Sequence, residues 1–298
     1  MKWSSQSLGT RLQHAFIWTL MRWHLTWFAR IIVKGIVCYY SLLPGVRKRC
    51  YPYLRRRFPG SSSFQLMRHC QRLYSTFAEV LFARTLAGIL GEIPPYEIDQ
   101  NKRLSIEDEV RDTGLIVLTA HFGAWQIALQ GLEGFQKPIN IVQWISKGDV
   151  DKHYFEHENQ RGKHAVHVID CRNGIQASLE IITALRRREI VCICGDRLTD
   201  SDAMRFSASF LQGVIPVPMT SFLLASMANV PVLITFSILD HGTIRNVCSE
   251  IVHVPQGLRR SPEKLQPYAQ KYVDVLEKLV FEYPYNFFNF YDMWNNAY

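Results

Sequence analysis

A histidine that closely follows a predicted buried strand is the strongest candidate for chemistry in this chain. Residues 115–119 form a mostly apolar run that predicts a buried strand, and His121 comes just after it. Gly123 follows, and residues 124–134 predict an apolar helix. Because ligands of open α/β sheets bind at the carboxyl ends of the strands, His121 is placed to act as a base. The positive end of the helix disfavours imidazolium and keeps the ring able to accept a proton. The alternative interpretation is a histidine that caps the helix or packs in the core.

The same stretch resembles the lysophospholipid acyltransferase superfamily, and in particular the bacterial lipid A biosynthesis late acyltransferase family. Members of that family often carry His-x-Gly-Asn-Trp-Glu, and this chain has His121, Gly123, Trp125 and Gln126 at the corresponding positions. Further similar blocks follow the family's order: a basic segment at 47–59, a strand and Gly-Asp-Arg turn at 190–197, Phe-Leu-Gln-Gly at 210–213 with Pro216 and Pro218, a Pro-Val strand at 229–234, and an aromatic tail at 283–294. The resemblance therefore extends from about residue 39 to the C-terminus.

This resemblance implies an enzyme that moves a fatty acyl group from an acyl thioester to a hydroxyl of a lipid or glycolipid. The usual donor in the family is acyl carrier protein, with CoA as the other thioester, and the place is the cytoplasmic face of the bacterial inner membrane. His121 is expected to be the base, and backbone N–H groups near Gly123 are expected to hold the oxyanion. The substrate-binding residues are expected to be Gly123, Trp125, Gln126, Arg197, Phe210 and Gly213. Neither a metal nor another cofactor is expected.

One departure from the family pattern concerns the residue that supports the histidine. Gln126 stands where relatives carry an acidic residue, and an amide can accept a ring N–H but offers no negative charge. Asp196 is the predicted replacement, because it follows a second apolar strand at 190–194 and would share the sheet edge with His121 if the strands are parallel neighbours. Arg197 is expected to bind an anionic headgroup or the phosphate arm of the donor. In the alternative interpretation, Asp196 and Arg197 form a structural ion pair or cap a turn.

Two other functions remain open at this point. One is a catalytically silent, lipid-binding relative of the family, because Gln126 replaces the family's acidic residue. A hydrolase is the other alternative, since His121 could activate water as readily as an alcohol, although the chain has no Gly-x-Ser-x-Gly motif of a serine hydrolase.

Positive charge is concentrated in the first quarter of the chain. The formal net charge is +8, and no acidic residue precedes Glu79. Residues 1–78 hold 13 of the 34 basic residues, so the other 21 face all 26 acidic ones. Tryptophan, tyrosine and aliphatic residues lie between these charges, a pattern that suits an anionic membrane surface. Nucleic acid, the alternative partner for such charge, is disfavoured by the large aliphatic residues.

The N-terminal segment is predicted to lie on the membrane rather than to cross it. Residues 31–43 are apolar but are interrupted by Lys34, and charge-free runs fall short of the ~18 residues that a span needs. An interfacial helix or helical hairpin is favoured over one tilted span, and no cleavage site of a signal peptide is evident. Residues 1–45 are therefore predicted to be a membrane-associating segment, and 46–298 a single acyltransferase-like domain.

The cysteines and the remaining histidines give weaker indications. Seven cysteines without metal-binding spacing suit a reducing cytoplasm, and Cys192 and Cys194 are expected to be small core residues. His153, Glu156 and His157 are more simply explained by a polar surface segment than by a metal site.

Strands that alternate with helices predict an α/β fold with a mainly parallel central sheet flanked by helices. Strands are expected at 115–119, 139–145, 165–169, 190–194 and 231–238. Helices are expected at 10–45, 64–91, 124–134, 174–187, 219–228 and 264–282.

Overall fold

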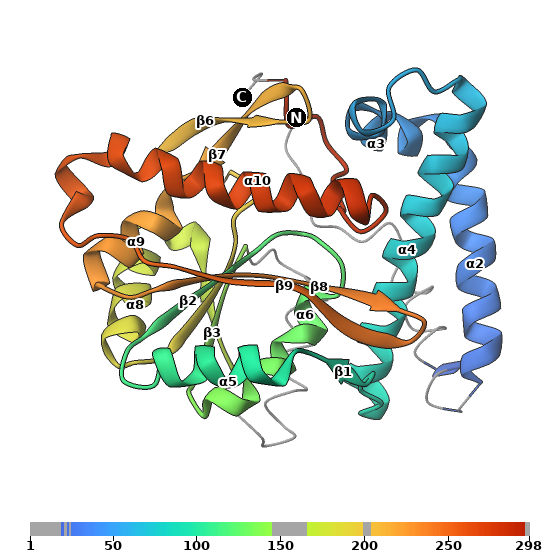
Figure 1. The fold of residues 1–298 in the computed structure, drawn as a ribbon. Coiled ribbons are helices and arrows are strands. Elements are labelled where there is room, and N and C mark those ends of the chain that lie inside the picture. The colour runs from blue at the N-terminus through green and yellow to red at the C-terminus, as the bar shows by residue number, and fades with distance from the viewer. Residues whose placement is uncertain (1–18, 21–22, 24, 145–165, 199–203, 296–298) are drawn as a thin grey trace.

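A seven-stranded mixed sheet forms the centre of the molecule (Figure 1). The computed structural model describes residues 19–20, 23, 25–144, 166–198 and 204–295. The strand order is β1-β9-β8-β2-β5-β3-β4. The strands are β1 (Tyr96–Glu97), β2 (Leu115–Thr119), β3 (Ile139–Gln143), β4 (Val166–Asp170), β5 (Ile190–Cys194), β8 (Val232–Asp240) and β9 (Thr243–Val252). Parallel pairing joins β4, β3, β5, β2 and β8, whereas β9 runs antiparallel to β8, so the prediction of a mainly parallel sheet is confirmed.

Helices cover both faces of this sheet. The helices α8 (Ile175–Arg186), α9 (Thr220–Ala228) and α10 (Gln266–Glu282) pack on one face, and α5 (Gln100–Glu109), α6 (Trp125–Ala128) and the 3-10 helix η1 (Leu129–Phe135) on the other. Side chains of β2 alternate between the two layers: Ile116 and Leu118 join the first, and Leu115 and Val117 the second. A strand buried on both faces is apolar throughout, which is why β2 and β5 have the bounds that the sequence predicts.

In the described part of the chain, three long helices precede the sheet. They are α2 (Thr26–Leu42), α3 (Pro44–Arg57) and α4 (Ser63–Leu90), and α2 lies along α4 through the buried side chains of Ala29 and Phe82 (Figure 1). A capping box between Ser62 and Gln65 starts α4. The helix predicted at 10–45 is shorter in the structure, because α2 begins at Thr26 and ends at Leu42. Pro44 then opens α3, which the sequence analysis missed. Residues 10–18, 21–22 and 24 of the predicted helix lie outside the described part of the chain.

The outward face of α2 carries large apolar side chains. Trp27 and Ile31 are exposed and share one face of the helix, because they are four residues apart, and Tyr39 is exposed farther along it. No single helix of the described residues is both long and apolar enough to cross a membrane. The pair α2 and α3 passes this test together, although the two helices are bent by 81° at their junction.

Several predicted elements need correction. The helix expected at 124–134 is one short α-helical turn, α6, followed by the 3-10 helix η1. The 3-10 helix packs closely on Tyr96, and a Cβ on Gly131 would lie 2.6 Å from the Tyr96 ring. The sequence analysis missed α5, β1, β9 and a separate hairpin of β6 (Arg205–Phe210) and β7 (Gly213–Pro218). Pro216 and Pro218 argue against a strand inside a sheet, but the strands of a two-stranded hairpin each have a free edge that tolerates proline.

Candidate active site

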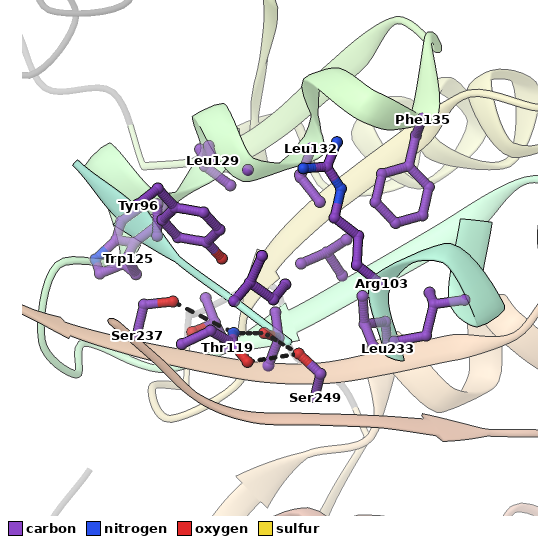
Figure 2. Close-up of a pocket in the computed structure, with 17 residues that line it drawn as sticks. Tyr96, Arg103, Thr119, Trp125, Leu129, Leu132, Phe135, Leu233, Ser237 and Ser249 are labelled. Carbon is purple, nitrogen blue, oxygen red and sulfur yellow. Dashed lines mark hydrogen bonds between the residues drawn. The ribbon is translucent and has the colours of Figure 1, made fainter. Parts of the chain in front are cut away.

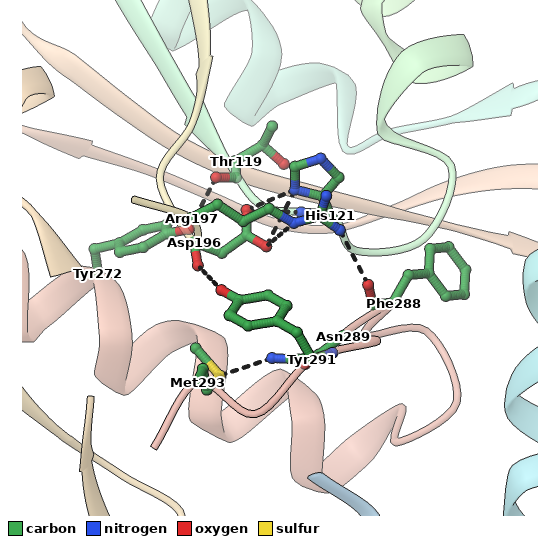
Figure 3. A network of polar contacts seen from close by, with 9 residues as sticks. All are labelled: Thr119, His121, Asp196, Arg197, Tyr272, Phe288, Asn289, Tyr291 and Met293. Carbon is green, nitrogen blue, oxygen red and sulfur yellow. Dashed lines mark hydrogen bonds and ion pairs between the residues drawn. The ribbon is translucent and has the colours of Figure 1, made fainter. Parts of the chain in front are cut away.

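The strands β2 and β5 bring His121 and Asp196 together at one edge of the sheet. The two strands pair in parallel, with Thr119 opposite Cys194, so the residues that follow them emerge side by side (Figure 3). The backbone N–H of Gly195 donates to the carbonyl of Thr119 at 2.8 Å and holds the two strand ends in this register. The prediction that the strands are parallel neighbours and open onto a shared edge is confirmed.

The carboxylate of Asp196 contacts His121 twice. One oxygen, Oδ1, accepts the backbone N–H of His121 at 3.0 Å and lies 2.9 Å from ring atom Nδ1, while Oδ2 lies 3.1 Å from the same ring atom. An ionised carboxylate only accepts hydrogen bonds, so Nδ1 carries the proton and Nε2 is the acceptor of the neutral ring. The His121 side chain is 30% exposed, against 3% for Asp196. A reachable base is thus held by a carboxylate that solvent does not reach.

Asp196 stays ionised despite its burial. Burial by itself raises the pKa of this carboxyl group, but the charge and hydrogen bonds of His121, together with the charge of Arg197, outweigh it. The pKa of Asp196 therefore lies below its ordinary value of 3.8. At neutral pH the carboxylate fixes the tautomer of His121 and can stabilise a positive charge on the ring.

Arg197 supports this charge from the other side. Its Nε lies 3.8 Å from Asp196 Oδ2, and its Nη2 donates to the carbonyl of Phe288 at 3.3 Å. The side chain is only 16% exposed, and its guanidinium lies 6.0 Å from the ring centre of Tyr291. The ion pair between Asp196 and Arg197, which the sequence analysis gave as the alternative interpretation, is present. Contact of Arg197 with an anionic headgroup stays a prediction.

Gln126 does not contact His121 in the way expected of the family's acidic residue. Its Oε1 accepts a hydrogen bond of 2.5 Å from Arg84 on α4. The supporting carboxylate of the histidine thus comes from β5 rather than from the motif itself, and Arg84 was not identified from the sequence.

Gly123 lies where β8 leaves no room for a side chain. Its φ is +54°, and a Cβ there would lie 2.1 Å from the carbonyl oxygen of Ser237 on β8. The backbone N–H of Gly123 donates to the carbonyl of Asn286 at 2.7 Å, so this group already has a partner. Oxyanion binding by N–H groups near Gly123 stays a prediction.

Trp125 lines a pocket on the α5 and α6 side of the sheet (Figure 2). The rings of Trp125 and His121 meet edge to face, with centroids 6.3 Å apart. Apolar walls come from α6, η1 and the sheet, among them Leu129, Leu132, Phe135 and Leu233. The polar groups on the sheet side are largely paired with one another, as Asn246 Nδ2 is with Thr235 Oγ1 at 2.9 Å. Trp125 is thus placed to touch both a group at His121 and an apolar chain in the pocket.

Phe210 and Gly213 lie on the β6–β7 hairpin and pack against the C-terminal tail. Phe210 is 1% exposed and stacks on Trp294, with ring centroids 5.9 Å apart. A Cβ on Gly213 would lie 2.7 Å from both Arg56 Nη1 and the Trp294 ring. The prediction that Phe210 binds substrate is not supported, since its buried ring has no surface to offer; both residues hold the tail in place.

Three side chains at this edge of the sheet could also be metal ligands. Within the described ranges, His121, Cys194 and Asp196 form a group whose potential ligand atoms lie within 4.8 Å of one another. Burial raises the pKa of the Cys194 thiol well above its ordinary value, and Nδ1 of His121 is bonded to Asp196. His153, Glu156 and His157 lie outside the described part of the chain.

Comparisons with protein-family models and with curated proteins found no match for this chain. The likeness to the late acyltransferases accordingly rests on the sequence motifs alone, and the geometry around His121 is the basis from which a function is inferred.

Proposed function

We propose that this protein is a membrane-associated O-acyltransferase. It moves a fatty acyl group from an acyl thioester, carried by acyl carrier protein or CoA, to a hydroxyl of a lipid or glycolipid at the cytoplasmic face of a bacterial inner membrane. The observation that carries this proposal is the partly exposed His121 ring with Nδ1 bonded to the buried, ionised Asp196. This arrangement suits a base that must take up a proton and give it back.

The proposed reaction proceeds through a tetrahedral intermediate. Nε2 of His121 takes the proton of the acceptor hydroxyl while the oxygen attacks the thioester carbonyl carbon and forms the new C–O bond. Asp196 stabilises the positive charge that the ring gains. The intermediate then collapses with cleavage of the C–S bond, and the imidazolium returns its proton to the departing thiolate. The thiol and the new ester are the products, and the base is restored.

The pocket behind Trp125 is the proposed site for the acyl chain. Its apolar walls favour burial of methylene groups, by roughly 0.8 kcal/mol for each CH₂. Trp125 both lines this pocket and meets the ring of His121, so the chain of a thioester whose carbonyl is next to His121 would reach the pocket past the tryptophan.

The silent, lipid-binding relative is the second candidate, and Gln126 was its only support. Asp196 offers His121 the charge that Gln126 lacks, so the substitution no longer argues against catalysis. The two functions make different predictions for lipid composition.

Mass spectrometry of total lipids tests the proposal. Cells that lack the gene are compared with cells that express the native chain or His121→Ala. We expect one lipid class to lose a single acyl chain in the deletion strain, to regain it with the native chain, and not to regain it with the variant. An identical lipid profile in all three strains contradicts acyl transfer, and equal restoration by both proteins contradicts the assignment of His121.

Attachment to the membrane is expected to depend on the exposed face of α2. Trp27 and Ile31 are 65% and 56% exposed. Changing both to serine removes about 3 kcal/mol of apolar insertion and should lower partitioning onto anionic phospholipid vesicles about 100-fold. Vesicle co-sedimentation of the full chain measures this.

A matched pair on α8 provides the control. Ile175 and Leu179 are 82% and 60% exposed, also four residues apart, so their change to serine costs similar apolar surface on another helix. We expect this control to bind vesicles like the native chain. Equal loss of binding by both double variants would show that α2 has no special part in attachment.

A further inference from the structure

The C-terminal tail crosses the ends of both strands that carry the histidine and the aspartate (Figure 3). This tail, residues 283–294, follows α10 and contains Asn286, Phe288 and Tyr291. The sequence analysis noted this stretch only as an aromatic tail. Its hydrogen bonds place it in direct contact with the backbone on either side of the site.

On the β2 side, the tail is bonded to the residues next to the histidine ring. The backbone N–H of Phe288 donates to the carbonyl of His121 at 2.8 Å, and the carbonyl of Asn286 accepts the N–H of Gly123 at 2.7 Å. These two bonds bracket the turn from which the His121 side chain projects, and so restrict the movement of its backbone.

On the β5 side, the tail is bonded to Asp196 and to Arg197, which follows it. The hydroxyl of Tyr291 donates to the backbone carbonyl of Asp196 at 3.1 Å, and Arg197 donates to the carbonyl of Phe288 at 3.3 Å. Phe288 is therefore linked to His121 through its N–H and to Arg197 through its carbonyl. One peptide segment thus ties the two halves of the site to each other.

We infer that this tail is a positioning element of the active site and that Tyr291 is a positioning residue, which keeps the Asp196 carboxylate against Nδ1 of His121. Tyr291 touches neither the ring nor the carboxylate through its hydroxyl; it acts on the backbone of Asp196. The consequence for catalysis rests on the proposed function, whereas the consequence for the histidine–aspartate hydrogen bond does not.

The tail also contains a tyrosine that serves as a matched control. The hydroxyl of Tyr285 lies 2.7 Å from Nδ1 of His69 on α4, and it accepts a hydrogen bond from Arg72 at 3.4 Å. Tyr285→Phe removes one hydroxyl from the same tail without touching the residues around His121. Both variants keep the aromatic ring, so both retain its packing.

The experiment compares Tyr291→Phe with Tyr285→Phe in the full chain. We expect Tyr291→Phe to lower kcat about tenfold with little change in KM, because small misplacements of catalytic groups are costly, and Tyr285→Phe to leave both constants unchanged. In proton NMR of the substrate-free protein, the downfield signal of the His121 Nδ1–H should broaden or disappear in Tyr291→Phe and persist in Tyr285→Phe. Thermal melting shows whether the two proteins are folded to a similar degree.

The outcomes separate the two claims. If the native chain transfers no acyl group but the Nδ1–H signal still depends on Tyr291, the proposed function fails and the positioning claim stands. If the signal and kcat of Tyr291→Phe match those of the native chain, the positioning claim is overturned. Equal losses in both variants would also overturn it, since they would indicate a general effect of the tail on stability.

Discussion

Replacing His121 with alanine is expected to abolish acyl transfer while the chain stays folded. The general base contributes on the order of 10²–10⁴-fold to rate, and no other described side chain is bonded to Asp196 in a position to replace it. The His121 side chain is 30% exposed, and its backbone keeps its bonds to Asp196 and Phe288 in the variant. Turnover of an acyl thioester with a lipid acceptor measures the loss, and circular dichroism and thermal melting measure the fold.

A second substitution distinguishes the loss of the base from the loss of the hydrogen-bond partner of the Asp196 carboxylate. Alanine leaves the buried carboxylate without its ring partner, which lowers stability to some degree. His121→Gln offers the carboxylate an N–H but cannot accept a proton as imidazole does, so it should melt closer to the native chain and remain equally inactive. His253→Ala is the surface control, because that side chain is 70% exposed and pairs with Glu109 away from the site. Appreciable transfer by folded His121→Gln would contradict the proposed mechanism.

The central part of the site follows from sequence patterns that have one physical meaning. A short apolar run bounded by polar residues is a buried strand, and the carboxyl ends of parallel strands meet at one edge. These two rules place His121 and Asp196 at a shared edge if the strands are parallel neighbours, and β2 and β5, which have the predicted bounds, meet that condition. Neither rule needs long-range information beyond the order of the strands.

Other parts of the site depend on contacts that the sequence does not signal. The tail residues Asn286, Phe288 and Tyr291 act mainly through backbone groups or a single hydroxyl, and such bonds leave no periodic pattern. Arg84 comes from a helix some 40 positions before Gln126, so the partner of the motif's glutamine appears only in the folded chain. Gly123 was expected to make room for substrate, but the crowding that requires glycine there comes from β8.

The N-terminal segment was predicted only in part. The uneven charge and the tryptophans are visible in composition, and the exposed face of α2 agrees with an amphipathic helix. The sequence did not reveal that the other face of α2 packs on α4, because Ala29 and Phe82 are far apart in the chain. Packing on α4 connects this segment physically to the body that carries the site.

The second large effect is expected from Asp196→Asn, which should lower acyl transfer by about 100-fold or more. Asparagine keeps the size of the side chain but removes the charge that stabilises the protonated ring. It can also present an N–H to Nδ1, which would favour the tautomer with the proton on Nε2 and so remove the acceptor needed for catalysis. The kcat of purified protein, measured with saturating donor, tests this directly.

The pH dependence of this effect follows from the lowered pKa of Asp196. A carboxyl group whose folded pKa lies below 3.8 is fully ionised from pH 5 upward, so the native chain keeps its advantage over Asp196→Asn at every pH from 5 to 8. The contribution of this ionisation to the free energy of unfolding is complete above the unfolded value of about 3.9 and is lost as the pH falls through the lower folded value. Activities that converge at pH 6 would contradict an ionised Asp196.

Substitutions at Gln126 are the matched comparison, because this position carries the acidic residue in the family that the motif resembles. Gln126→Ala should reduce kcat far less than Asp196→Asn, since Gln126 is bonded to Arg84 and not to His121. Gln126→Glu should form an ion pair with Arg84 and leave kcat within a few-fold of the native value.

A native chain that is inactive and gains transfer only through Gln126→Glu would favour the silent, lipid-binding relative. The opposite result would be an active native chain that tolerates Asp196→Asn but not Gln126→Ala. Asp196 would then have no part in the mechanism, because the charge beside His121 would be dispensable. The side chain of Gln126 would be required instead.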